Sequence, residues 1–363
     1  MSIGLPTFEI DFIQKAVTAI TRSERGIACI VVYDDTVTDP GYATYKYAAD
    51  VSKTGFTEAN YNAIQKCWLV SVNKVIVVHV PTATEFATVQ AILEKLSYNY
   101  VCVVNSEAQA ALVSYIISKN NQSKGKKYVA VVANVTTADS KYVINLKGDW
   151  VHEVGAGENT PMVNYLPRMT SILANLPLNR SITYYELEDL DKVDDSYITI
   201  EKDADSWVDK GWLLLLNDED GVLVGRGVNT LTTFTSTDTE DMRKIIIMEA
   251  LNLIIEDIYK VFKANYVGKY KNYLDNQYLF ISAINTYFRN LGTEEVLDPE
   301  FNNLARIDVE SQRNAWLGIG KTAAADWDED TVKKMTFKSY VFLAGDIKVL
   351  DAVEDLKFAI TLE

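Results

Sequence analysis

Four apolar runs, each long enough to form one strand, recur between residues 25 and 150. Continuous apolar runs of this kind are typical of parallel strands that are buried on both faces of a sheet. Stretches with a helical pattern separate the runs, and such alternation predicts a mainly parallel sheet with helices on its faces. The sequence therefore predicts an α/β domain over 25–150, built on the runs GIACIVVYDD, KVIVVHVP, NYVCVVNS and KYVAVVANV.

A second, mixed α+β domain is predicted over 151–340. Apolar runs on both sides of Asp220-Gly221 indicate a hairpin, because Asp-Gly is a strong turn signal between strands. The sequence from Thr237 to Glu240, TDTE, matches a capping box in front of a long helix over Asp241–Asn265. That helix is apolar on more than one face, so we expect it to be buried and to form the scaffold of this domain.

Both ends of the chain carry a short alternating pattern that predicts a half-buried strand. We expect extended arms over 1–24 and 341–363, joined to the rest of the chain through hinges at Gly26 and Gly345. A terminal strand can pair within its own chain or add to the sheet edge of a neighbour, and the pattern alone leaves both possibilities open. The apolar positions available for exchange between subunits are Phe8, Ile10, Phe12, Leu356, Phe358, Ile360 and Leu362.

The net charge of the chain limits the classes of partner that it can bind. Its 363 residues include 50 acids and 35 lysines and arginines, so the net charge is −15. This balance argues against a general nucleic-acid binder and against docking on an anionic membrane. We see no signal peptide and no run of about 18 apolar residues that would span a membrane. Three cysteines, an odd number in apolar surroundings, predict free buried thiols in a reducing cytoplasm: Cys29, Cys67 and Cys102.

Few motifs in the chain could carry chemistry. Residues 315–322, AWLGIGKT, match a relaxed P-loop and leave a nucleotide-binding enzyme as an alternative, although a P-loop needs a buried strand before it and ARIDVESQRN is polar. The acids at Asp203, Asp205 and Asp209 lack the glycine and glutamate of an EF-hand. Two histidines are too few for a convincing zinc site. We therefore expect no catalytic, cofactor or metal site, and no enzyme activity.

Three segments resemble contractile tail sheath proteins. The run GRGVNTLTTFTSTDTEDMRKIIIMEALNLIIEDI, followed by YVGKYKNYLDNQYLFISAINTYFRNLG, is similar to the C-terminal region of these sheaths. The opening GLPTFEIDFIQKAVTAITRSERGIACIVVYDD and the closing MTFKSYVFLAGDIKVLDAVEDLKFAITL resemble the small sheaths of PBSX-type defective prophages and diffocin-like phage-tail bacteriocins (R-type). The resemblance covers nearly the whole chain and is weakest over about 50–150.

The resemblance implies a structural subunit that polymerises as stacked hexameric rings around an inner tube in a metastable extended state. Contraction would drive the tube through the target cell envelope without nucleotide hydrolysis. The implied partners are further copies of the chain, the tube protein, and the baseplate and tail terminator proteins, with no nucleic acid and no membrane insertion. The implied particle is a phage tail or a phage-tail-like particle, assembled from protein made in the bacterial cytoplasm. Another structural component of the same particle stays an alternative.

The resemblance also assigns places to parts of the chain. It implies that 25–150 faces outward, that 151–340 lies near the tube, and that both arms exchange strands with neighbouring subunits. Sheath–tube contacts in such systems are polar, and the candidates for them here are Lys333, Lys334 and Lys338. Seven residues from Leu356 to Leu362 would span about 23 Å as a strand, which is enough to cross a neighbour's sheet edge.

Overall fold

The computed structural model describes residues 19–36, 38–136, 138–219 and 221–361. The chain divides into two compact units. The sheet unit comprises Arg22–Lys260, Glu294–Val296 and Val349–Glu363, and the helical unit contains Val261–Thr293 and Leu297–Lys348. Within the described residues, no helix is long and apolar enough to cross a membrane.

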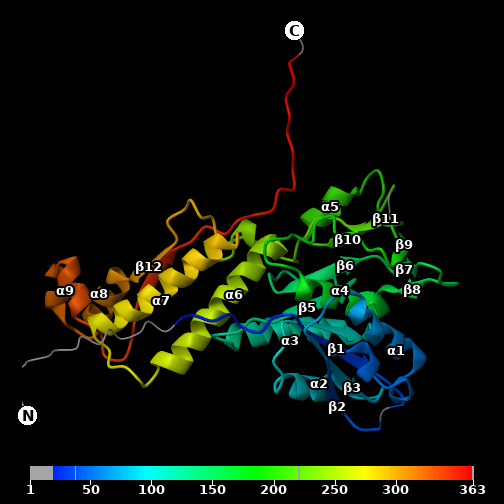
Figure 1. The fold of residues 1–363 in the computed structure, drawn as a ribbon, viewed down its shortest axis with the longest axis horizontal. Coiled ribbons are helices and arrows are strands. Elements are labelled where there is room, and N and C mark those ends of the chain that lie inside the picture. Colours follow the sequence, from blue (N-terminus) through cyan, green and yellow to red (C-terminus); the bar gives the residue numbers. More distant parts are fainter. Residues whose placement is uncertain (1–18, 37, 137, 220, 362–363) are drawn as a thin grey trace, which may run out of the picture. The chain divides into compact units, whose positions relative to one another are not determined.

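An eight-stranded sheet forms the centre of the sheet unit (Figure 1). Its strand order is β11-β10-β6-β5-β4-β1-β3-β2, and the two outermost strands pair antiparallel with their neighbours. All four predicted strands are confirmed and run parallel, as β1, β3, β4 and β5. The strand bounds are β1 Ile27–Tyr33, β2 Gly41–Tyr45, β3 Lys74–Val80, β4 Tyr100–Val104, β5 Val129–Ala133, β6 Val143–Lys147, β10 Leu213–Asp218 and β11 Gly221–Val224.

Helices cover both faces of this sheet, because successive side chains of each strand point to opposite faces. Ile30 and Val32 of β1 join one buried cluster with residues of α1 and α4, while Cys29 and Val31 join a second cluster with α2 and α3. The three cysteines are free and buried, as predicted. The helix bounds are α1 Glu58–Gln65, α2 Phe86–Leu93, α3 Gln109–Gln122, α4 Met162–Asn175, α5 Ala204–Asp209 and α6 Ile245–Val261.

The mixed α/β fold is confirmed, but the predicted ranges 25–150 and 151–340 differ from the two units. The sheet continues past residue 150, because β10 pairs in parallel with β6 and β11 closes the predicted hairpin beside it. A small three-stranded sheet, β7 Trp150–Glu153, β8 Thr160–Pro161 and β9 Leu190–Val193, belongs to the same unit. As a division into outer and tube-proximal parts, the predicted ranges stay a prediction.

Helix α6 is buried on several sides, since four consecutive residues, Ile245–Met248, are each at most 9% exposed. The predicted capping box in front of it is wrong. A short 3₁₀ helix, Glu240–Arg243, precedes α6 and has no side-chain cap at Thr239. The hydroxyl of Thr235 instead accepts hydrogen bonds from the backbone N–H groups of Thr237 and Asp238.

The described part of the helical unit contains three α-helices and one strand pair. These elements are α7 Leu274–Thr293, α8 Val309–Gly318, α9 Glu329–Lys334, β12 Leu304–Ile307 and β13 Leu343–Asp346. Before α7, a π-helical turn spans Phe262–Tyr266, and the rings of Phe262 and Tyr266 both pack against Phe280 of α7. Strands β12 and β13 form an antiparallel two-stranded sheet of their own.

Candidate assembly interface

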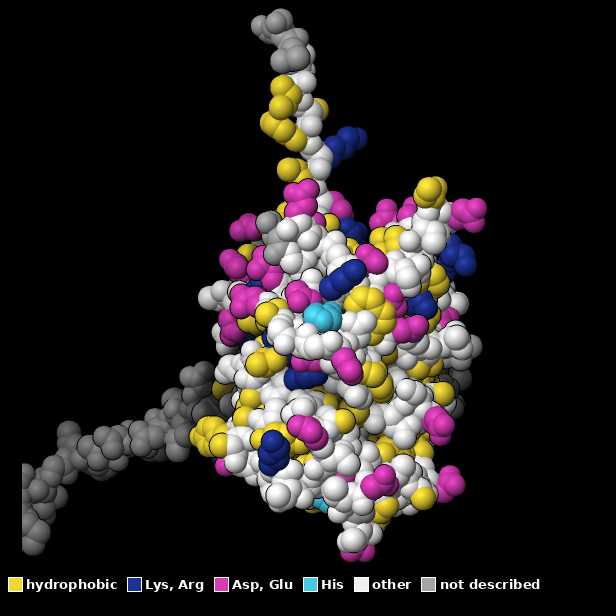
Figure 2. Space-filling model, turned by 90° about the vertical axis from the view of Figure 1, so that its right-hand side faces the viewer, with side chains coloured by type: hydrophobic (Ala, Val, Ile, Leu, Met, Phe, Trp, Pro, Cys, Tyr) yellow, Lys and Arg dark blue, Asp and Glu magenta, His cyan; other side chains and the backbone are white. Residues whose placement is uncertain are grey.

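The C-terminal segment 349–361 carries apolar side chains that its own chain leaves uncovered. Leu356, Phe358 and Ile360 are 91%, 76% and 70% exposed, and residues 350–361 form no strand or helix. Figure 2 shows the segment projecting with hydrophobic side chains along it and acidic side chains gathered where it leaves the sheet unit. Burial of one such side chain stabilises by roughly 1.5–3 kcal/mol, so these three leave an unfavourable apolar face exposed along the segment.

Hydrogen bonds and ion pairs hold the start of this segment to the rest of the sheet unit. The side chain of Glu354 is only 4% exposed. Its Oε1 accepts hydrogen bonds from the hydroxyls of Thr183 at 2.5 Å and Ser181 at 3.0 Å. Its Oε2 lies 3.3 Å from Nζ of Lys244 and 3.9 Å from Nε of Arg226. We call the contacts of Asp351, Glu354 and Asp355 with the sheet unit the C-terminal root.

Two more exposed pairs surround Glu354. Lys244 also pairs with Asp351, and Arg226 Nη2 lies 2.5 Å from Asp355 Oδ1. Burial by itself raises the pKa of Glu354, but the hydrogen bonds from Thr183 and Ser181 and the charge of Lys244 outweigh it, so the pKa falls below its ordinary value. The carboxylate is therefore held in its charged form.

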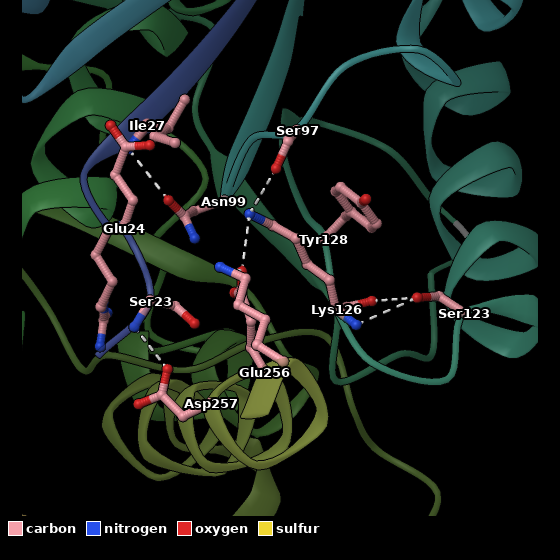
Figure 3. Close-up of polar contacts among 12 residues, drawn as sticks. Ser23, Glu24, Ile27, Ser97, Asn99, Ser123, Lys126, Tyr128, Glu256 and Asp257 are labelled. Carbon is pink, nitrogen blue, oxygen red and sulfur yellow. Dashed lines mark hydrogen bonds and ion pairs between the residues drawn. The ribbon is translucent and has the colours of Figure 1, made fainter. Parts of the chain in front are cut away.

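The other terminal connection is also fixed, by residues 22–26, which we call the N-terminal root (Figure 3). The backbone N–H of Ser23 donates to Asp257 Oδ1 of α6 at 2.7 Å. Arg25 pairs with Glu249 of α6, whose second oxygen accepts a hydrogen bond from the hydroxyl of Tyr100 at 2.5 Å. The root thus ties the start of β1 to α6 within the sheet unit.

Both predicted hinge glycines lie in packed backbone. Gly26 has φ +77°, and a Cβ there would lie 2.3 Å from Oδ1 of Asn175, so glycine is needed for the backbone and for space. Gly345 lies in β13 opposite Ala305, where a Cβ would lie 3.0 Å from the backbone oxygen of Leu304. Neither position is a free joint in this structure, and the hinge function stays a prediction.

The strand pair β12–β13 has one capped edge and one open edge among the described residues. Asn285 of α7 binds both the N–H and the C=O of Ala305, at 2.7 and 3.2 Å, so the outer edge of β12 is occupied. Ala305 stands opposite Gly345, and Arg306 opposite Ala344. In an antiparallel pair, every second residue turns its N–H and C=O outward. The outward groups of β13 therefore belong to Leu343 and Gly345.

The remaining predicted positions are distributed as follows. Lys333 pairs with Glu329 and Asp330 on its own helix α9, and Lys334 ends that helix. Lys338 has φ +46° and its Nζ lies 5.2 Å from the ring centre of Phe337. Phe8, Ile10, Phe12 and Leu362 lie outside the described residues.

The structure does not support the alternative of a nucleotide site at 315–322. Residues 315–318 belong to helix α8, so no strand runs into the loop, and a 3₁₀ helix over Thr322–Asp326 follows it. A P-loop requires a strand before the loop and an α-helix after it. Across the described ranges, no group of three or more histidines, cysteines or acids is placed to hold a metal ion.

Sequence reasoning missed the residues that make the two roots and the capped edge. Lys244 and Asn285 belong to no local pattern that marks them. The one local signal is the acidic pair Glu354-Asp355, which stands directly before the alternating run.

Solved structures define the class to which this architecture belongs. The fold matches the sheath tail protein from Desulfitobacterium hafniense with a TM-score of 0.65, at 14% identity, over 83% of this chain and 94% of that one. It matches the contracted helical sheath of the anti-feeding prophage with a TM-score of 0.71, at 12% identity, over 100% of both chains. These likenesses show a shared fold, that of tail sheath subunits.

The sequence comparisons give the family. Residues 237–363 match the phage tail sheath C-terminal domain. The chain is 30% identical over 372 residues to the tail sheath protein of Clostridium phage phiCD119, with 99% of each covered. The chain belongs to the tail sheath protein family. It is a structural subunit of a phage tail or phage-tail-like particle, and its family is not one of enzymes.

Proposed function

We propose that this chain polymerises by passing its C-terminal segment to the open edge of β13 in a neighbouring subunit. The observation that carries the proposal is the uncovered alternation of Leu356, Phe358 and Ile360, in a chain that also carries an open strand edge. Strand addition of this kind gives affinity through backbone hydrogen bonds and register through alternate side chains. Because donor and acceptor are different surfaces, the contact links each subunit to the next in a closed ring or an open helix.

We propose further that the assembly consists of stacked hexameric rings around an inner tube, held extended until contraction drives the tube forward. Energy stored in the lattice replaces nucleotide hydrolysis. The N-terminal residues Phe8, Ile10 and Phe12 serve as a second exchange strand. Lys333, Lys334 and Lys338 contact the tube, and the baseplate and tail terminator bind the two ends of the sheath. Synthesis takes place in the cytoplasm.

The test of strand exchange compares the full chain with a chain that ends after Glu354. We expect the full chain to form tubular or ring-stacked polymers by electron microscopy and the shortened chain to stay monomeric. In a finer version, Phe358→Ser and Ile360→Ser remove the apolar face, and Ala359→Ser is the matched control on the opposite face. Equal polymerisation of all these chains would refute the exchange.

A further inference from the structure

We propose that Glu354 is a positioning residue that moors the C-terminal segment to the sheet unit, so that the free strand begins at Leu356. The inference rests on the proposed strand exchange for its purpose, but the mooring itself is a property of the single subunit. It places the point from which the arm departs after Asp355, and not at the predicted joint at Gly345, which lies inside β13.

The burial of Glu354 stands out against its neighbours. Val353 is 98% exposed and the side chain of Asp355 is 78% exposed, whereas that of Glu354 is 4% exposed. A segment that leaves a valine in water and buries a carboxylate is not held by the hydrophobic effect. Burial of an unpaired charge is unfavourable, so the contacts that surround this carboxylate hold the segment in place.

The hydroxyl groups that donate hydrogen bonds to Glu354 are themselves held in place. Thr183 Oγ1 also accepts a hydrogen bond from the backbone N–H of Gly227 at 2.9 Å. The next residue, Tyr184, donates its N–H to the carbonyl of Val224 in β11 at 2.9 Å. The hydroxyls therefore sit on a loop that is hydrogen-bonded to the edge of the large sheet. A receptor that is already ordered loses little entropy when the carboxylate binds.

The segment has a second point of attachment just before the mooring. The backbone N–H of Leu350 donates to the carbonyl of Val296 at 3.1 Å, within the sheet unit. Two attachments, at Leu350 and Glu354, define a direction for the strand that follows. Without the C-terminal root, the exposed residues would leave from residue 350 and sample many directions, which would lower their effective concentration at a neighbour's edge.

Solvent reaches one side of the mooring. A groove of about 730 Å³ lies beside it, and its lining includes Asp205, Asp209, Glu240 and Lys244 together with Glu354. Solvent and ions that enter this groove reach the ion pairs of Glu354 from one side. Salt weakens pairs that solvent can reach, so we expect the exposed pairs of the C-terminal root to weaken as the ionic strength rises.

The test is hydrogen exchange, followed by mass spectrometry, on the unassembled full chain at low protein concentration. In Glu354→Gln, we expect the amide of Leu350, whose hydrogen bond to Val296 lies next to the mooring, to exchange at least tenfold faster than in the parent chain. Amides of β1 and β4 should keep their rates, which shows that the fold is intact. The matched control is Glu201→Gln, the same change at an exposed glutamate of the sheet unit that lies outside the root, and it should change this rate less than twofold.

A second variant separates a specific mooring from a general loss of charge. Ser181→Ala removes one hydrogen-bond donor from the loop that holds Glu354. It should speed exchange at Leu350 in the parent chain but add nothing in Glu354→Gln. Unchanged exchange in Glu354→Gln, or an equal effect of Glu201→Gln, would overturn the proposal. Failure of strand exchange is read separately: if shortening the chain after Glu354 leaves polymerisation intact while these exchange results hold, the mooring stands and the proposed function fails.

Discussion

The two roots fasten the ends of the sheet unit in different ways. The N-terminal root is held by a hydrogen bond from its backbone and by one ion pair of low exposure. In that pair, the side chains of Arg25 and Glu249 are 21% and 15% exposed. The C-terminal root is held by contacts of side chains alone, and Glu354 is the one buried acid among them. The comparison sets an attachment that includes the backbone at one end against an attachment made by side-chain charges at the other.

The largest effect is expected from breaking the N-terminal root. Arg25→Met leaves Glu249 with the hydroxyl of Tyr100 and no countercharge, and removal of one partner from such a pair costs about 3 kcal/mol. Urea unfolding of the unassembled chain measures this loss in the free energy of unfolding. Arg22→Met is the control, because its pair with Glu294 is more exposed and should contribute less than about 1 kcal/mol. Equal losses of unfolding free energy in both variants would contradict the prediction that the Arg25–Glu249 pair holds the N-terminal root.

A smaller loss is expected at the glycine of the same root. Gly26→Ala places a methyl group against Asn175 at a left-handed φ, and we expect a loss of about 2 kcal/mol in the free energy of unfolding. Gly157→Ala is the matched control, since a Cβ there meets nothing within 4 Å. If Gly26 were a free joint, the two variants would unfold at the same urea concentration.

The smallest effect on stability is expected from acid, and it should fall on the C-terminal root. Because the pKa of Glu354 is lower in the moored state than the ordinary value of 4.5, the mooring is complete above that value and is lost as the pH falls through the lowered pKa. Lys244 and Arg226 stay charged throughout this range, while Asp351 and Asp355 face the same cations.

Fluorescence anisotropy of a dye on Leu356→Cys would follow this release, because the three native cysteines are buried. We expect the anisotropy to drop as the pH falls below the ordinary glutamate value of 4.5, while near-UV circular dichroism stays constant. In Glu354→Gln the anisotropy should be low at every pH. A drop at the same pH in that variant would assign the transition to another group.

The central sheet was predictable because its signal is local. Each of the four runs, such as KVIVVHVP, is long enough to fill one buried strand, and no distant residue is needed to recognise it. The uncovered C-terminal alternation was predictable for the same reason. The contacts of the roots were not, because Ser181 and Glu354 are 173 residues apart and meet only through the tertiary fold.

The predicted capping box failed for a related reason. The letters of the motif were present at Thr237 and Glu240, but Thr235 already binds two N–H groups at this turn. The predicted hinge at Gly345 illustrates a second limit of prediction from sequence. The sequence does not distinguish a glycine that bends the chain from one that leaves room beside a strand. Only the pairing with Ala305 distinguishes the two.

The most direct test of the exchange is a disulfide between two different chains. One chain would carry Ile360→Cys and the other Leu343→Cys, and they would be mixed under polymerising conditions and oxidised, with Leu356→Cys and Phe358→Cys covering other registers. Since the native cysteines are buried, the new thiols are the reactive ones. We predict a covalent dimer that contains one chain of each kind. Polymers that form without any such dimer at all three positions would contradict the account.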